Sequence, residues 1–227
     1  EKTQYRCGHF EQPNILAHVR YNERTDADGK RVLFVEEVQS DWAQEGRKKG
    51  FKNDQRVVGW DDPAYVAVRG RATDALNAFN RASSNPTLQA QLEPELEAAT
   101  SELRAIEAEN NRHNKAAPPA PFVTDTKAWT KLALSRMIRY AVDNGFDAVA
   151  WTTGDQQYNR YPDADAESDT GKKRAEGMRA FYDGIVPQVA RDLLKKIGGG
   201  GVESITFAPT GTAGVRGIPG VTPMQAF

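Results

Sequence analysis

A strand, turn and strand between residues 15 and 42 constrain the fold of this chain more than any other feature. Residues 15–24 and 30–42 are strand-like, and residues 25–29 between them contain an Asp-Gly pair. Asp-Gly between two such runs is the strongest short-range signal for a β-hairpin. The sequence therefore predicts an antiparallel hairpin in its first fifth.

The second strand of this hairpin changes character along its length. Residues 32–35 are all apolar, as in a strand that is covered on both faces. The residues after them are mostly polar, and period-two alternation places Glu37 and Gln39 on one face and Val38 on the other. Polar groups at the end of a buried strand indicate either a site that opens from the core or a strand that emerges into solvent.

Residues 61–121 are predicted to form a helical hairpin. An aspartate at position 61 or 62 would cap the first helix, with Pro63 in its first turn. The pattern breaks at residues 83–86, and a second helix follows with apolar residues at mostly three- and four-residue intervals. A Pro/Ala-rich stretch closes the segment, which we interpret as an interaction or packing arm.

The second half of the chain predicts a helix, a strand, a helix and a strand. A helix capped at residues 124–126 ends at Asn144 and Gly145, and an apolar strand follows at residues 146–154. Because the helix and a glycine turn lead directly into this strand, we expect it to run parallel to a neighbour. Three further segments complete this half: an acidic loop, a basic helix that Pro187 divides or kinks, and a short strand, at residues 155–171, 172–197 and 202–207 respectively.

These elements predict an α+β fold with a mixed, mainly antiparallel central sheet flanked by helices. Residues 1–60 would form the hairpin half of the domain, residues 61–121 the inserted helical hairpin, and residues 122–227 the second half. Because the chain starts without methionine and stops after a Gly/Pro-rich stretch, we interpret it as a piece of a longer protein.

Composition argues against several functional classes. Thirty Lys and Arg residues against 31 Asp and Glu residues give no net charge that would hold nucleic acid or an acidic membrane. No apolar run approaches the roughly 20 residues that span a bilayer, and the first residues are polar, unlike a signal peptide. The single Cys7 excludes an internal disulfide, which fits the cytoplasm, and the three histidines lack metal-like spacing.

Three stretches of this sequence resemble a known module. Residues 13–20, 32–42 and 144–157 look like a recurrent domain of the very large polyvalent proteins of phages and prophages. The resemblance implies that this chain is part of a larger phage polypeptide, either in the cytoplasm of a bacterial host or associated with the virion. It implies no particular activity.

The order of elements is similar to that of the GNAT N-acetyltransferase superfamily. A hairpin ends in a strand with acidic residues and is followed by a basic, glycine-containing segment, residues 44–50. A long helix, a strand, a helix with Phe181 and Tyr182, and a final strand pair follow. The resemblance implies a GNAT-like fold that binds acetyl-CoA and transfers its acetyl group to an amine of unknown identity, on a protein or a small molecule.

The resemblance also assigns roles to individual residues. Glu37 or Glu36 would be the general base, and Tyr182 would protonate the leaving thiolate. The hairpin strand would bulge, and its backbone would cradle the acetyl group. A helix N-terminus would bind the pyrophosphate, for which backbone amides and the helix dipole are apt. The cofactor-binding residues implied in this way are Val38, Gln39, Ser40, Arg47 and Gly50, and no resident metal is implied.

Two alternatives come from other functional classes. Asp26 and Asp28 near the hairpin turn, followed by Glu37-Val38-Gln39, resemble the core of PD-(D/E)xK nucleases, which would bind Mg²⁺ and cleave a phosphodiester. A third interpretation is a non-catalytic interaction module, in which the acidic helical arm binds another protein.

Overall fold

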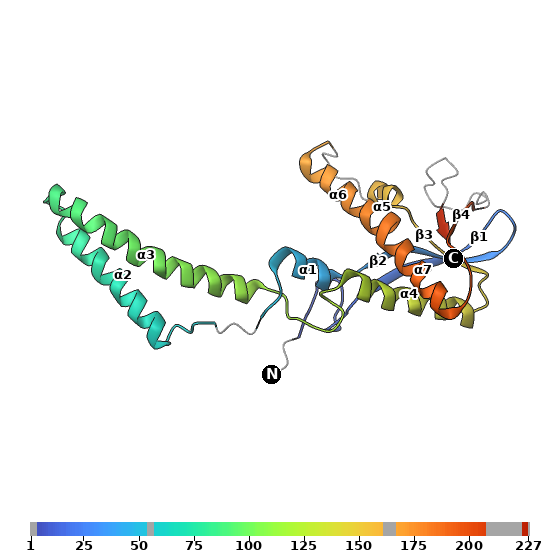
Figure 1. The fold of residues 1–227 in the computed structure, drawn as a ribbon, viewed down its shortest axis with the longest axis horizontal. Coiled ribbons are helices and arrows are strands. Elements are labelled where there is room, and N and C mark those ends of the chain that lie inside the picture. Colours follow the sequence, from blue (N-terminus) through green and yellow to red (C-terminus); the bar gives the residue numbers. More distant parts are fainter. Residues whose placement is uncertain (1–3, 54–56, 161–166, 208–223, 227) are drawn as a thin grey trace. The chain divides into compact units, whose positions relative to one another are not determined.

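The computed structural model of this chain describes residues 4–53, 57–160, 167–207 and 224–226, and its elements divide between two compact units (Figure 1). The described residues of one unit are Gln4 and most of Gln44–Pro119, and those of the other lie within Tyr5–Ala43 and Ala120–Phe227. The first unit begins well before residue 61, where the sequence places the start of the helical insertion. Phe51 accounts for part of this difference, because its bridge partner is Ala117, beyond the hairpin.

The predicted hairpin is confirmed. Strand β1 (His18–Thr25) pairs antiparallel with β2 (Arg31–Gln39). The Oδ1 atom of Asp26 accepts hydrogen bonds from the backbone nitrogens of Asp28 and Lys30, at 2.9 and 2.8 Å. Gly29 has a φ of +83°, a conformation that glycine adopts without steric cost. The Asp-Gly pair therefore closes the turn as the sequence predicts.

The sheet is mixed, with the strand order β1-β2-β3-β5-β4. Strand β3 (Ala148–Trp151) runs parallel to β2, which confirms the expected parallel pair. Strands β4 (Glu203–Ile205) and β5 (Met224–Ala226) are antiparallel to each other, and β5 also pairs antiparallel with β3. The α+β class and the mixed sheet are thus confirmed, whereas the sequence analysis left β5 within an unassigned tail.

The main core lies between the sheet and two helices, α4 (Thr126–Asp143) and α7 (Val186–Ile197) (Figure 1). Asp125 caps α4 by accepting from the nitrogens of Lys127 and Ala128, and Gly145 follows its end with a φ of +66°. The core combines alternate strand residues with one stripe of each helix, including Leu33, Val35, Val38, Val149, Trp151, Trp129, Leu134, Met137, Val186, Val189 and Leu193. The other face of the sheet carries a smaller cluster of Val32, Phe34 and Ala150, against which Ile205 and Phe207 pack.

The segment after β3 is more helical than the sequence analysis predicts. Residues 155–160 are not part of a loop but belong to α5 (Gly154–Arg160), while residues 161–166 of the expected loop lie outside the described residues. The basic helix comprises α6 (Asp169–Arg179), a π-helical turn η1 (Ala180–Ile185) and α7, in direct succession. Pro187 lies in the first turn of α7, where its missing N–H is tolerated.

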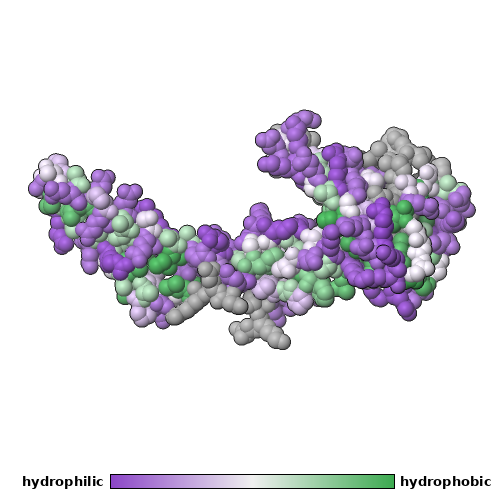
Figure 2. Space-filling view, viewed as in Figure 1, coloured by the Kyte–Doolittle hydropathy of each residue, from purple (hydrophilic) through white to green (hydrophobic). Residues whose placement is uncertain are grey.

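The other unit contains a pair of long helices. Helix α1 (Asp41–Lys49) follows β2 and leads into this unit, where α2 (Pro63–Arg81) and α3 (Pro86–Lys115) pack side by side (Figure 1). Asp62 and Asn85 cap these two helices. No residue of α3 is fully buried, and hydrophilic side chains cover much of the hairpin face shown in Figure 2. None of the helices in the described ranges combines the length and apolar character that crossing a membrane requires.

Candidate functional site

A β-bulge in β2 determines where its acidic side chains point. The pairing with β1 shifts between Arg20 and Tyr21, where Glu36 is left as an additional residue. Such an insertion changes which residues share a face of the strand. Val35 before the bulge and Val38 after it consequently both pack in the core under α4 and α7.

The same bulge brings two carboxylates to the opposite face of the sheet. Without it, Glu37 would follow Val35 into the apolar core by period-two alternation. With it, Glu37 lies opposite Arg20, and Glu36 contacts Asn22 and Arg24, which alternate with the core-facing residues of β1. The acidic end of β2 is therefore built by one extra residue.

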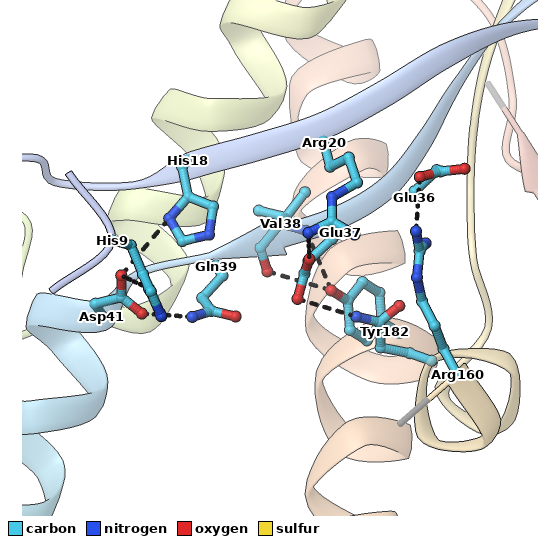
Figure 3. Close-up of polar contacts among 11 residues, drawn as sticks. His9, His18, Arg20, Glu36, Glu37, Val38, Gln39, Asp41, Arg160 and Tyr182 are labelled. Carbon is cyan, nitrogen blue, oxygen red and sulfur yellow. Dashed lines mark hydrogen bonds and ion pairs between the residues drawn. The ribbon is translucent and has the colours of Figure 1, made fainter. Parts of the chain in front are cut away.

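Glu37 is nearly buried, with 9% of its surface exposed. Its Oε1 atom accepts a hydrogen bond from Nε2 of Gln157 at 3.3 Å, and its Oε2 atom lies 3.4 Å from Nη2 of Arg20 (Figure 3). A buried carboxylate needs such partners, because it has lost its hydration. Glu37 is thus held in place by one amide and one guanidinium.

Glu36 binds two guanidinium groups. Its Oε2 atom lies 2.9 Å from Nη2 of Arg160 (Figure 3). Its Oε1 atom accepts from Nδ2 of Asn22 at 2.7 Å and lies 3.6 Å from Nη2 of Arg24. Arg24 also stacks on the ring of Phe34, 4.1 Å from its centroid. Glu36 therefore links β1 to the end of α5.

The backbone of β2 continues beyond its parallel partner. The last residue pair between the two strands is Val35 with Trp151, after which β3 ends. Farther along β2, the N–H of Val38 donates to the hydroxyl of Tyr182 at 3.1 Å, and this hydroxyl lies 3.3 Å from the carbonyl oxygen of Val38 (Figure 3). A tyrosine hydroxyl thus satisfies the polar groups of a strand edge that none of the described strands covers.

Tyr182 is placed by the π-helical turn. Short π-helical segments are rare and occur frequently at functional sites. The indole Nε1 of Trp151 donates to the carbonyl oxygen of Tyr182 at 3.3 Å, which ties the turn to the end of β3. Burial raises the pKa of Tyr182 well above its usual value, so that its hydroxyl stays protonated at neutral and mildly alkaline pH.

Helix α5 supplies Gln157 and Arg160, which the sequence analysis missed. A capping box starts this helix: the nitrogen of Thr153 donates to Oε1 of Gln156 at 2.9 Å, and the nitrogen of Gln156 donates to Oγ1 of Thr153 at 3.2 Å. Asp183 of the π-helical turn accepts from the nitrogen of Gly154 at 2.9 Å. The Thr-x-x-Gln spacing was the sequence signal that could have revealed this helix.

Gln39 and Ser40 do not join the group around Glu37. The side chain of Gln39 donates to Asp41, and the hydroxyl of Ser40 donates to the carbonyl of Leu16 at 2.5 Å and accepts from the nitrogen of Ala43 at 3.1 Å. Asp41 also lies 3.0 Å from Nδ1 of His9. Burial of the Asp41 carboxyl raises its pKa, but the hydrogen bonds from Gln39 and His9 lower the pKa by a larger amount. The pKa of Asp41 therefore lies below its usual value. These residues fix the start of α1.

Arg47 and Gly50 are placed differently from what the resemblance implies. They follow the start of α1 instead of preceding a helix: Arg47 lies in its last turn, and Gly50 ends it with a φ of +82°. The nitrogen of Gly50 donates to the carbonyl of Gly46 at 2.8 Å, so it is bonded within the helix end. Residues 44–50 therefore lie in the later turns of α1 and at its end, not ahead of a helix N-terminus.

The acidic residues of the nuclease hypothesis are not brought together. Asp26 closes the hairpin turn that precedes β2. Glu37 lies six residues beyond the first residue of β2, and six residues of extended strand span about 20 Å. Within the described residues, no group of three His, Cys, Asp or Glu side chains could hold a metal ion. The geometry therefore gives the nuclease hypothesis no support.

No family model, curated protein or solved structure matches this chain. The arrangement of the site itself is consequently the basis for assigning a function.

Proposed function

We propose that the sheet-containing unit is a GNAT-like acyltransferase that transfers an acetyl group from acetyl-CoA to an amine. One observation carries the proposal: the backbone N–H of Val38, beyond the end of the parallel strand, is engaged by the hydroxyl of Tyr182 next to the nearly buried Glu37. A strand N–H beyond the parallel partner, a protonated hydroxyl and a carboxylate are the three groups that the acetyl transfer requires.

The end of β3 at Trp151, short of Val38 on β2, supports the place of the acetyl group. The N–H of Val38 would donate to the thioester carbonyl oxygen, on which negative charge develops during attack. This requires the Tyr182 hydroxyl to give up its contact with the N–H, which leaves the hydroxyl available to the sulfur. The bulge at Glu36 supports the same assignment, since the resemblance implies a bulged strand that holds the acetyl carbonyl.

The proposed step is balanced in atoms and protons. The amine nitrogen attacks the thioester carbon, a C–N bond forms and the C–S bond breaks. Glu37 accepts the proton that the amine loses, and Tyr182 donates its proton to the departing sulfur. Proton exchange with solvent then restores both residues, so that a neutral amine and acetyl-CoA yield an amide and CoA.

The proposal assigns no pyrophosphate contact to α1. Asp41 is the first residue of this helix, and a carboxylate there already interacts favourably with the helix dipole. A second anion at the same place would be repelled. Arg47 and Gly50 are therefore not part of the proposed site.

The test is binding of acetyl-CoA and acetyl transfer. Isothermal titration calorimetry should show binding of acetyl-CoA to the chain, and release of CoA should be measured with a thiol reagent in the presence of simple amines. Glu37→Gln and Tyr182→Phe should each lower kcat by about 100-fold or more, the usual effect of removing a general base or acid.

A matched control is Glu23→Gln, which removes an exposed β1 carboxylate that pairs with Arg31, on the core-facing side of the hairpin. This variant should keep the wild-type kcat. Absence of acetyl-CoA binding would refute the proposed function, and so would full activity of a folded Glu37→Gln protein.

A further inference from the structure

The carboxylates of the site belong to a larger charged group. We call this group the acceptor cluster and define it by six side chains: Arg20, Arg24, Glu36, Glu37, Gln157 and Arg160. Hydrogen bonds and ion pairs of 2.9–3.6 Å join Arg24 and Arg160 to Glu36, and join Gln157 and Arg20 to Glu37. They come from β1, from the bulged part of β2 and from α5, and Figure 3 shows Arg20, Glu36, Glu37 and Arg160 among them.

The acceptor cluster has more positive than negative groups. Three guanidinium groups face two carboxylates, and Glu36 alone is shared by Arg24 and Arg160. The side chains of these two arginines are 32% and 33% exposed, so a molecule in solution can contact them. Arg24 is also held on the ring of Phe34, which fixes its orientation before anything binds.

A buried amide oxygen in the cluster has no hydrogen-bond partner among the described residues. Gln157 is 2% exposed, and its Nε2 is used by Glu37. Its Oε1 accepts no hydrogen bond from any described residue. Buried polar atoms are normally hydrogen-bonded, so an unpaired acceptor beside the base indicates a place for a donor from a ligand. An amine supplies such a donor.

From these observations we infer that the acceptor is a primary amine that also carries an anionic group, either a carboxylate or a phosphate. The amine binds between Glu37 and the free oxygen of Gln157, and its anionic group binds Arg160 and Arg24, whose planar forks suit carboxylates and phosphates. This inference rests on the proposed function, because the amine is the acceptor of the acetyl group.

Two pairs of amines test the inference. β-Alanine is compared with β-alaninamide, and phosphoethanolamine with ethanolamine, in the acetyl-CoA assay with the whole chain. In at least one pair, kcat/KM should be tenfold or more higher for the anionic member, and the pair in which this occurs distinguishes carboxylate from phosphate. Arg160→Gln should reduce this ratio toward one, whereas Arg160→Lys, which keeps the charge but not the planar fork, should reduce it less.

The control is Arg139→Gln, which removes an exposed guanidinium of α4 that pairs with Asp143 and should leave the ratio unchanged. Circular dichroism verifies that each variant is folded. Ratios near one in the wild-type protein, a ratio unaffected by Arg160→Gln, or transfer to none of the four amines would overturn the inference. If acetyl-CoA binds but both members of each pair are acetylated equally well, only this inference is overturned. If acetyl-CoA does not bind, the proposed function is refuted as well.

Discussion

Tyr182 links the core to the site through a single hydroxyl. Its ring packs in the core under the sheet, while its hydroxyl contacts both backbone polar groups of Val38. The sequence predicts Glu37 and Tyr182 as site residues only through its resemblance to a known order of elements. It could not identify Gln157, which hydrogen-bonds to a residue 120 positions earlier, because nothing in a linear pattern reports that contact.

Removal of the Tyr182 hydroxyl should destabilise the fold as well as slow the reaction. In Tyr182→Phe the buried N–H of Val38 loses its acceptor, which should cost about 1–3 kcal/mol of unfolding free energy at pH 7. Urea unfolding measures this loss. The control is Tyr158→Phe, which removes a buried hydroxyl without a partner among the described residues, so its unfolding free energy should be unchanged or slightly higher. Equal losses in both variants would contradict the assigned role.

Tyr182 also predicts a dependence of stability on pH. Burial raises its pKa in the folded state above the unfolded value of about 10. The folded state therefore holds this proton more tightly, and the resulting stabilisation is complete below pH 10 and decreases as pH rises toward the folded pKa. The unfolding free energy of the wild-type protein should fall more steeply between pH 9 and 11 than that of Tyr182→Phe. Parallel curves would show that Tyr182 does not contribute.

At the scale of elements, the close approach of α5 to α6 depends on one glycine. A Cβ atom at Gly154 would overlap the backbone of Arg179, 2.6 Å from its nitrogen, and backbone atoms cannot move aside cheaply. Gly154→Ala should therefore lower the unfolding free energy by about 1–3 kcal/mol, measured by urea or thermal unfolding. It should also weaken acetyl transfer, because α5 carries Gln157.

Gly177→Ala is the matched control for this element. Gly177 is in the interior of α6, and a Cβ atom there meets nothing within 4 Å. Alanine at such a position should raise the unfolding free energy by about 0.5–1 kcal/mol, because glycine is the poorer helix former. A Gly154→Ala protein as stable as Gly177→Ala would mean that α5 and α6 are not held against each other in this way.

Local chemistry explains which elements the sequence could predict. The Asp-Gly turn, the Asp125 cap and the apolar run of β3 depend on neighbouring residues, and all three were predicted. The bulge at Glu36 has no sequence signature, because it depends on the register with β1. Strand β5 has three residues and pairs between β3 and β4, so only contacts distant in sequence define it.

At the scale of the whole molecule, the chain enters and leaves the pair of long helices at one place. Phe51 and Ala117 form a parallel bridge, in which the nitrogen of Lys52 donates to the carbonyl of Ala117 at 2.8 Å and the nitrogen of Ala117 donates to the carbonyl of Gly50 at 2.9 Å. The α2–α3 hairpin is therefore held at its base by backbone hydrogen bonds that its own helices do not make.

Removal of the hairpin should leave the sheet-containing unit folded. Replacement of residues 54–114 by a short Gly-Ser linker should shift the melting temperature of that unit by a few degrees at most and leave its affinity for acetyl-CoA unchanged, because no residue of the proposed site comes from α2 or α3. Circular dichroism and calorimetry measure the two properties. Loss of acetyl-CoA binding by a folded deletion variant would give the hairpin a direct part in the site.

The bulge in β2 also decides which changes of length this gene can tolerate. Deletion of one codon at position 36 or 37 would remove the extra residue, so Val35 and Val38 would still face the core in a regular strand, but only one of the two carboxylates would remain. A substitution alters one side chain, whereas such a deletion removes the bulge that brings two adjacent carboxylates to the same face. Lineages of this protein that keep both carboxylates should therefore keep the number of residues between the hairpin turn and α1 constant.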